Sequence, residues 1–163
     1  MRGNVAVSMR ISLFRAQNNY YILDEPFMNG ESESTDLDKI CEEVKRAGKI
    51  TGEHLTRLAM IFGSRFQKAW EAVRDNRVKK YIFKPSGRVM WIVVGRERDY
   101  IVMPDAGFCS CDDFYFHVMS RKAHLCYHLI GQRIAEALGW YDEIEESDEM
   151  YDFLMSEWKK ATP

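Results

Sequence analysis

The chain has 163 residues, which fits one domain or one domain with a small appendage. Hydrophobic residues make up 46% of it, enough for a packed core, which excludes wholesale disorder. The formal net charge of -2 excludes a globally basic coat for nucleic acid but allows a local basic patch. No apolar run is long enough to cross a bilayer, and the N-terminus lacks the apolar stretch of a secretory signal. We therefore expect a protein that is neither secreted nor embedded in a membrane.

The first 50 residues are predicted to hold two short strands and one helix. Residues 11–14 and 20–23 are apolar enough for strands, and residues 29–36 form a polar sequence typical of a loop. A helix capped by Thr35 or Asp36 follows, because apolar residues recur there at i, i+3, i+4 and i+7. Its predicted buried positions are Leu37, Ile40, Cys41 and Val44.

Residues 51–76 are predicted to form a pair of helices. The first starts near Thr51 and ends at Gly63, and Ser64 caps the second. His54 lies in the first helix, where we expect it to be exposed. Such a pair either packs into the core or presents a DNA-reading helix, and core packing is the simpler interpretation. Three cations suggest phosphate contact: Arg65, Lys68 and Arg74.

After the helical pair, the pattern changes to that of β-strands. Residues 78–83 and 89–94 are rich in β-branched and aromatic side chains. The sequence between them predicts a hairpin, because Pro85 pre-sets the first corner of a turn and Gly87 tolerates a positive φ. A third strand at residues 100–103 completes a three-stranded antiparallel meander.

The helical period returns in the last part of the chain. Residues 125–138 have one apolar face and end at Gly139. Ser147 caps a last amphipathic helix, so residues 141–163 are predicted to be an acidic C-terminal helix. The predicted fold is therefore α+β. Its segments are an N-terminal part (1–50), a helical pair (51–76), a zinc-binding domain (77–140) and the acidic helix (141–163).

Three of the four cysteines lie within eighteen residues of one another, beside histidines. Because no secretion signal is evident, this grouping favours a reducing compartment and metal binding over a disulfide framework. The spacing is Cys-x-Cys, fourteen residues, then Cys-x-His. Structural zinc takes four nitrogen or sulfur ligands in a tetrahedron. We predict one structural zinc ion, bound by the Cys3His cluster of Cys109, Cys111, Cys126 and His128.

The spacing also predicts where each ligand lies. Residues i and i+2 of an extended strand point to the same side, so Cys109 and Cys111 can reach one ion as the third strand ends. Residues i and i+2 of a helix do not face each other. Cys126 must therefore lie in the turn that enters a helix, and His128 in its first turn. The result is a ββα-like unit with zinc between the hairpin and the helix.

Three alternatives explain the cysteines less well. A disulfide would leave an odd cysteine and would need an oxidising compartment. A Cys/His nucleophile needs a thiolate, a base and an oxyanion site, and has no use for three thiols. A catalytic zinc keeps an open position for water, whereas three cysteines and one histidine close the coordination sphere. His117 and His124 lie between the ligand pairs and are candidate substitutes, although surface positions are the simpler interpretation.

These residues resemble the SWIM zinc finger, whose pattern is Cys-x-Cys, a variable gap and Cys-x-His. The run CSCDDFYFHVMSRKAHLCYHLI is similar to the recombination-associated branch of that family, the Shu-complex SWIM proteins. In that branch Phe-x-Phe-x-Val follows the first ligand pair, which corresponds here to Phe114, Phe116 and Val118. The Pro-Ser-Gly-Arg hairpin is similar as well, and the likeness covers about residues 53 to 140. Gly131 replaces a frequent Ala of the family.

The resemblance implies a non-enzymatic partner of RecA-type recombinase paralogues that supports recombinase filaments on single-stranded DNA. The location would be cytoplasmic and nucleoid-associated, or nuclear. An enzyme is disfavoured, because the sequence has no phosphate loop, nucleophile elbow or carboxylate pair beside the ligands. The alternative is a zinc protein that binds DNA directly, single-stranded or regulatory. Its candidate DNA contacts are Lys79, Lys80, Lys84 and Arg88.

Two charge patterns bear on this choice. Residues 74–98 hold eight Lys or Arg against two acids, with aromatics between them, which suits a single strand of DNA. Alternatively these aromatics are core, because strand alternation separates Lys80 from Tyr81. Residues 142–158 hold eight acids and no Lys or Arg. An acidic amphipathic helix there either docks onto a partner or packs on its own domain, and it would repel DNA.

Overall fold

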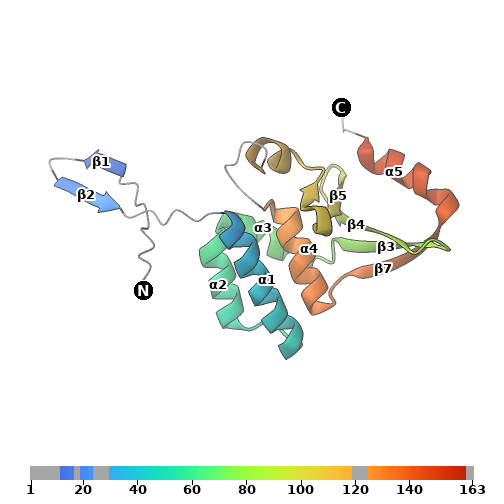
Figure 1. The fold of residues 1–163 in the computed structure, drawn as a ribbon, viewed down its shortest axis with the longest axis horizontal. Coiled ribbons are helices and arrows are strands. Elements are labelled where there is room, and N and C mark those ends of the chain that lie inside the picture. The colour runs from blue at the N-terminus through green and yellow to red at the C-terminus, as the bar shows by residue number, and fades with distance from the viewer. Residues whose placement is uncertain (1–11, 17–18, 24–29, 119–124, 161–163) are drawn as a thin grey trace, which may run out of the picture.

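The computed structural model describes residues 12–16, 19–23, 30–118 and 125–160. The fold is α+β, as predicted, with four helices on one side of a five-stranded sheet and a fifth helix on the other (Figure 1). The helices are α1 (Gly30–Ala47), α2 (Gly52–Phe62), α3 (Ser64–Arg74), α4 (Tyr127–Leu138) and α5 (Tyr151–Lys159). The strands are β1 (Ser12–Ala16), β2 (Asn19–Leu23), β3 (Val78–Lys84), β4 (Arg88–Val94), β5 (Asp99–Met103), β6 (Phe108–Cys109) and β7 (Asp142–Ser147). Within the described ranges, none of the helices has the length and apolar character that crossing a membrane requires.

Strands β1 and β2 form a separate antiparallel pair, with Ser12 opposite Leu23. They correspond to the two strands predicted at residues 11–14 and 20–23. Residue 11 and the residues around this pair lie outside the described part of the chain.

Helix α1 begins earlier than the sequence predicts. The polar segment 29–36 is a predicted loop, yet the helix starts at Gly30. The reason is a contact distant in sequence: Glu33 is only 8% exposed, and Arg65 of α3 binds both of its carboxylate oxygens. Local patterns cannot reveal such a partner. The apolar face is as predicted, with Leu37, Ile40 and Val44 buried and Cys41 half-buried.

The entry into α2 corrects the prediction for His54. The Thr51 hydroxyl accepts from the His54 backbone N–H at 3.4 Å, and the His54 Nδ1 accepts from the Thr51 N–H at 3.2 Å. This reciprocal cap satisfies two N–H groups that the helix start leaves unpaired, and it buries His54, which the sequence predicted to be exposed. Gly63, at φ 53°, then takes the N-cap position of α3 that the sequence assigned to Ser64.

Helix α3 packs into the core, which agrees with the simpler interpretation of the helical pair. Its buried side chains are Phe66, Ala69, Ala72 and Val73, and the helix lies against α4. Because this face is covered, α3 does not present it to DNA.

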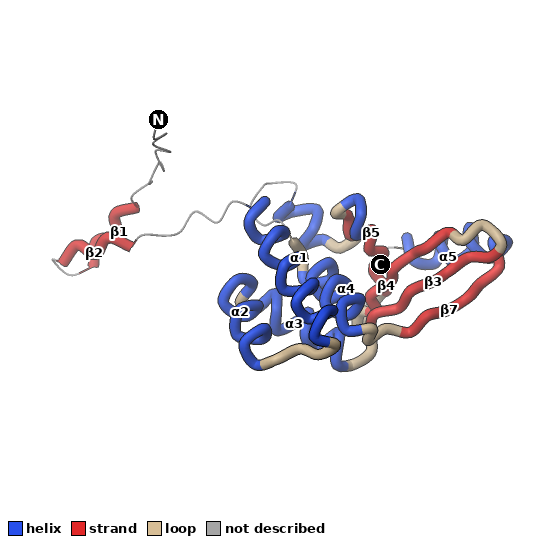
Figure 2. The backbone as a smooth tube through the Cα atoms, turned by 60° about the horizontal axis from the view of Figure 1, so that its bottom comes forward, coloured by secondary structure: helices blue, strands red, loops and turns tan. Residues whose placement is uncertain are grey.

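The sheet has the order β6-β5-β4-β3-β7. The predicted three-stranded meander is confirmed: β4 pairs antiparallel with β3 on one side and with β5 on the other. Strand β7 was not predicted: residues 142–147 pair parallel with β3, with Lys79 opposite Asp142 and Lys84 opposite Ser147. The two strands run side by side along their whole length (Figure 2). The acidic segment 141–163 therefore begins with a strand, which the sequence did not reveal. The predicted Ser147 cap is confirmed: its hydroxyl accepts from the Glu149 N–H at 3.3 Å, a 3-10 turn (Asp148–Met150) follows, and α5 begins at Tyr151.

The reason that the sequence did not reveal β7 is chemical. Strand β7 has the sequence DEIEES, and Asp and Glu are depleted in strands. Its stability comes from the basic strand beside it, because Lys79 pairs with Asp142, Lys80 with Glu143 at 3.2 Å, and Lys84 with Glu145 at 3.8 Å. Opposite charges across a pair of strands favour the pairing. A pattern confined to residues 142–147 contains none of this information.

Two apolar cores lie on the two faces of the sheet. The larger one joins α1–α4 to one face, and the smaller one joins α5 to the other. The smaller core contains Phe83, Met90, Ile92, Ile101, Met155 and Trp158. Tyr81 packs against Trp158, with ring centroids 4.9 Å apart. The final helix therefore packs on its own domain, which is one of the two roles that the sequence left open.

Close packing between α3 and α4 occurs at Gly131, the position where the SWIM pattern often has Ala. A Cβ at Gly131 would lie 3.4 Å from the Ala69 carbonyl oxygen, which is an ordinary contact. We expect Gly131→Ala to stabilise the protein by about 1 kcal/mol, because Ala has the higher helix propensity. Thermal unfolding should show a rise of about 2–4 °C. At Gly95, by contrast, a Cβ would lie 2.3 Å from the Arg98 carbonyl oxygen.

Gly95→Ala is therefore the matched control, and it should lower the unfolding temperature. If Gly131→Ala also destabilises the chain, the α3–α4 contact is tighter than the structure indicates.

Candidate metal centre

The Cys3His cluster assembles as the sequence predicts. The four candidate ligand atoms lie within 4.8 Å of one another, although the two pairs are far apart in sequence. All four side chains are buried: Cys109 is 1% exposed, Cys111 4%, Cys126 3% and His128 2%. Buried thiols and imidazole at this mutual distance match the donor set of a structural zinc site.

The first ligand pair is fixed to the edge of the sheet. Cys109 ends β6, where it lies opposite Val102 of β5. Ser110, the residue between the two cysteines, holds this segment against β5. The Ser110 N–H donates to the Ile101 carbonyl, and the Ile101 N–H donates to the Ser110 hydroxyl, both at 3.0 Å. This reciprocal pair of hydrogen bonds orients the sulfurs on either side of Ser110.

The second ligand pair lies at the start of α4. Cys126 is the N-cap residue, with φ -74° and ψ 162°, and His128 is in the first turn. This placement confirms the prediction that the pair straddles the helix start. The ring of Tyr100 from β5 lies against the imidazole, with centroids 4.1 Å apart. Tyr100 thereby fixes the ring orientation, a role that no local sequence pattern indicates.

The helix start also controls the charge of the cluster. Hydrogen bonds from the Cys109 and Cys111 thiols, together with the backbone N–H groups of Leu129 and His128, lower the pKa of Cys126 to about 4. The pKa of Cys109 is raised, because its thiol donates within the same cluster and is buried. In addition, the Phe114 N–H donates to the Cys111 sulfur at 3.2 Å. These contacts thus favour the thiolate at Cys126, which is the form that binds metal.

A test of whether zinc fits is provided by His128. Both ring nitrogens are buried, and neither has a hydrogen-bond partner among the residues that the structure describes. A buried polar atom without a partner costs about 1–3 kcal/mol. A metal ion bound to the imidazole and the three sulfurs would take up one of these nitrogens. The donor set and its burial therefore identify a site for one structural zinc ion, held by all four residues.

Arg65 supports the cluster from α3, and sequence reasoning missed this role. Its guanidinium donates to both carboxylate oxygens of Glu33, at 2.7 and 3.1 Å, and to the Leu125 carbonyl at 2.7 Å. Leu125 directly precedes the ligand Cys126. Arg65 therefore joins α1, α3 and the entry to α4, and the phosphate contact suggested for it is replaced by this internal network. No local pattern could reveal it, because Leu125 is 60 residues away.

The candidate DNA contacts lie along β3 and at the start of β4. Lys79, Lys80 and Lys84 each pair with an acid of β7. Hydrogen bonds from Lys79 and Asn76 lower the pKa of Asp142, which keeps that carboxylate charged. The Arg88 guanidinium lies 4.0 Å from the centroid of the Tyr151 ring in α5. All four cations are thus engaged within the protein.

Two aromatic residues of the basic strands are buried in the protein. Phe83 is fully buried, and Trp91 is 6% exposed. They belong to the two cores, as the alternation of the strands indicated, and they do not offer free faces for stacking on bases.

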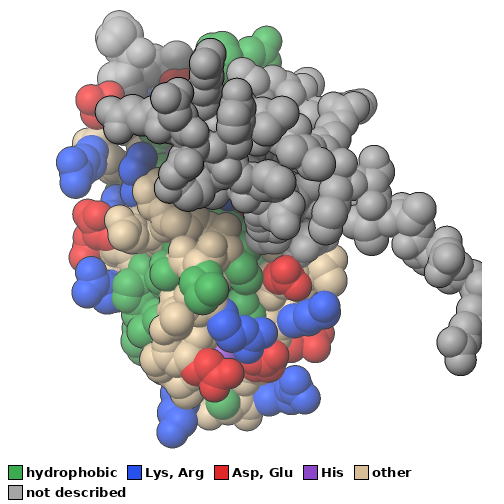
Figure 3. Space-filling view, turned by 90° about the vertical axis from the view of Figure 1, so that its left-hand side faces the viewer, with side chains coloured by type: hydrophobic (Ala, Val, Ile, Leu, Met, Phe, Trp, Pro, Cys, Tyr) green, Lys and Arg blue, Asp and Glu red, His purple; other side chains and the backbone are tan. Residues whose placement is uncertain are grey.

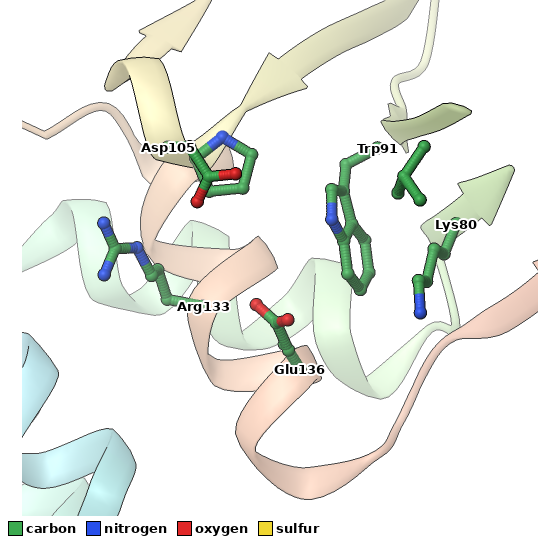
Figure 4. A pocket seen from close by; sticks show the side chains of 7 residues that line it. Lys80, Trp91, Asp105, Arg133 and Glu136 are labelled. Atoms are coloured by element: carbon green, nitrogen blue, oxygen red, sulfur yellow. The ribbon is translucent and has the colours of Figure 1, made fainter. Parts of the chain in front are cut away.

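A cavity of about 410 Å³ opens between α4, β4 and the turn at Pro104. Figure 4 shows Arg133 and Glu136 projecting from α4 on one side and Trp91 on the other. Arg133 pairs with Asp38, and Glu136 accepts a hydrogen bond from Gln132 at 2.9 Å. Because Lys80, Arg133 and Glu136 of this cavity already have partners, it does not resemble a site built for a charged substrate.

The two histidines considered as substitute ligands are not placed by the structure. His124 lies outside the described residues, and only the backbone of His117 is described. The four predicted ligands form a complete tetrahedral set without them.

The fold and the site together define a class of protein: an α+β domain closed by a buried structural zinc site of three cysteines and one histidine. The chain is 30% identical over 118 residues to a Zinc finger SWIM domain-containing protein 7 homolog of Dictyostelium discoideum, covering 71% of this chain and 76% of that protein. It is 28% identical over 127 residues to Zinc finger SWIM domain-containing protein 7 of Homo sapiens, covering 76% and 90%. It is also 32% identical over 105 residues to a protein of Archaeoglobus fulgidus, covering 63% and 83%. The chain belongs to the family of SWIM-type zinc finger proteins. No family model and no solved structure matches it.

Proposed function

We propose that this protein is a non-enzymatic interaction subunit in homologous recombination and DNA repair, partnering a RecA-like recombinase paralogue. It would act where the DNA is, in the cytoplasm on the nucleoid or in the nucleus. The observation that carries the proposal is the Cys3His cluster, whose first ligand pair is followed by Phe114, Phe116 and Val118, similar to the Phe-x-Phe-x-Val run of the recombination-associated SWIM branch. The Phe114 N–H donates to the Cys111 sulfur, so this run is built onto the zinc site.

The charge distribution supports a protein partner over DNA. The lysines of β3 are paired with acids of β7, Phe83 is buried, and Tyr81 is partly buried against Trp158. On the face over α1 and α2, Lys and Arg side chains are mixed with Asp and Glu (Figure 3). Nucleic-acid binding relies on clustered cations that replace the counterions of the phosphates. Direct DNA binding therefore stays the second candidate, with Lys79, Lys80, Lys84 and Arg88 as its contacts.

The direct test of the proposal is co-expression with the RecA-like ATPases of the same host, followed by purification under gentle conditions. We expect one of these ATPases to co-purify in a fixed ratio to the zinc protein. If none associates, the proposed function is wrong.

The ion pairs between β3 and β7 lead to a prediction about DNA binding. Asp142→Asn, Glu143→Gln and Glu145→Gln together free three lysines, so the triple variant should bind single-stranded DNA at low salt more tightly than the wild type. With about three phosphate contacts, its affinity should fall about twentyfold between 50 and 200 mM salt. Fluorescence anisotropy with a labelled oligonucleotide measures both quantities.

The control removes the same charge away from β7, by Glu42→Gln, Glu149→Gln and Asp152→Asn, and leaves Glu157 in place because that residue pairs with Lys160. Equal DNA affinities for the two triple variants would show that net charge matters and that the β7 pairing does not.

A further inference from the structure

An exposed aromatic surface lies beside the zinc site, and the packing of the domain does not account for it. We call it the knuckle face and define it by Phe108, Phe114, Tyr115 and Phe116. Phe108 is 38% exposed, Tyr115 66% and Phe116 65%. A hollow of about 630 Å³ lies over it, lined by Phe108, Phe114 and Tyr115 and floored by the two cysteines of the first ligand pair. Exposed aromatics that gather at one place are typical of interaction sites.

The knuckle face is held in shape by the metal ligands. The rings of Phe108 and Phe114 meet edge to face, with centroids 5.2 Å apart. The Phe114 N–H donates to the Cys111 sulfur and the Tyr115 N–H donates to the Cys111 carbonyl, both at 3.2 Å. Tyr115 and Phe116 also pack edge to face at 5.3 Å. The aromatic rings are therefore presented on a fixed support, which lowers the entropy lost on binding.

The charges around this surface indicate the chemistry of its partner. Asp112 lines the hollow, and Asp113, also exposed, follows it directly in the sequence. Asp112 contacts Arg98 at 3.3 Å, but its side chain is still 85% exposed. An acidic rim repels the phosphates of nucleic acid and attracts Lys and Arg.

We propose that the knuckle face docks a short segment of a partner protein in which an aromatic or aliphatic anchor is followed closely by Lys or Arg. The anchor fills the hollow over Phe108 and Tyr115, and the cation meets Asp112 at the rim. The inference rests on the proposed function, because it gives the interaction subunit its docking surface. Aromatic anchors in such hollows usually supply most of the binding free energy.

The experiment uses a random peptide library displayed on phage and selected on the full-length, zinc-loaded protein. We expect enrichment of peptides that place Lys or Arg within about three residues of an aromatic or aliphatic anchor. These peptides should bind the double variant Tyr115→Ala, Phe116→Ala at least tenfold more weakly than the wild type. They should bind Phe153→Ala as tightly as the wild type, because Phe153 is a 57% exposed aromatic on α5.

Zinc content and unfolding temperature of each variant verify that the substitutions leave the fold intact. If no peptide is enriched, or if the enriched peptides bind the double variant as tightly as the wild type, the docking surface is wrong. Selection on peptides does not require a recombinase, so this failure is distinct from failure of the proposed function. If a RecA-like ATPase binds the wild type and the double variant equally, the proposed function stands and the knuckle face is excluded as its docking site.

Discussion

Replacing Cys126 by serine is expected to abolish zinc binding and the cooperative folding of at least residues 77–140. Cys126 is buried, caps α4 and is held as thiolate by its neighbours, so serine cannot replace it as a ligand. Structural zinc contributes on the order of 10 kcal/mol to folding, which is as much as the whole stability of a typical domain, about 5–15 kcal/mol. Circular dichroism during heating, with zinc quantified by metal analysis, should show a chain without a sharp transition. Treatment of the wild type with a strong chelator should have the same effect.

The matched control is Cys41→Ser. Cys41 is free and half-buried on α1, away from the cluster, and burial raises its pKa to about 12. This variant should keep one zinc ion and a sharp unfolding transition. If Cys126→Ser unfolds like Cys41→Ser and retains its metal, the ligand assignment is wrong.

Arg65→Ala should give the second-largest loss, about 3 kcal/mol of unfolding free energy. The substitution leaves the carboxylate of Glu33, 11% exposed, without its cation and removes the donor to the Leu125 carbonyl. Breaking a buried ion pair by removing one partner typically costs about 3–5 kcal/mol, and we take the low end because the Arg65 side chain is 26% exposed. The unfolding temperature should fall by about 10 °C, measured with zinc bound.

Arg74→Ala tests whether this loss is specific. Arg74 is an exposed arginine at the end of the same helix, so its removal should change the unfolding temperature little. Equal transitions for the two variants would mean that the Glu33–Arg65–Leu125 network does not hold the entry to α4.

The zinc site could be predicted from the sequence almost completely, because its geometry follows from local spacing. Each ligand pair has a single residue between its two members. In an extended segment, as at Cys109 and Cys111, and across a helix start, as at Cys126 and His128, this spacing lets both side chains reach one metal ion. The structure places Cys126 at the N-cap of α4, in agreement with that argument. Cys109 lies not at the end of the third strand, as predicted, but at the end of β6, a further strand that the sequence did not reveal, and Cys111 lies just beyond it. The meander was equally accessible, because each strand carries its own β-branched residues and the turn at Gly87 has its own chemistry.

Two of the larger features that the sequence did not reveal depend on partners far along the chain. Glu33 lies in a helix because Arg65 binds it, and β7 is a strand because the lysines of β3 lie beside it. The basic segment 74–98 and the acidic segment 142–158 were two separate hints of external partners. The structure joins them, since Lys79, Lys80 and Lys84 pair with Asp142, Glu143 and Glu145. Composition alone cannot distinguish a charged surface that binds a partner from one that binds its own neighbour.

The central claim is that the Cys3His cluster holds one structural zinc ion, and the metal content of the purified protein tests it most directly. The chain should be purified under reducing conditions without chelators and without a histidine tag, and analysed by plasma mass spectrometry. We predict about one zinc ion per chain, on the basis of one tetrahedral set of four ligands. A folded protein that contains no zinc would contradict the account.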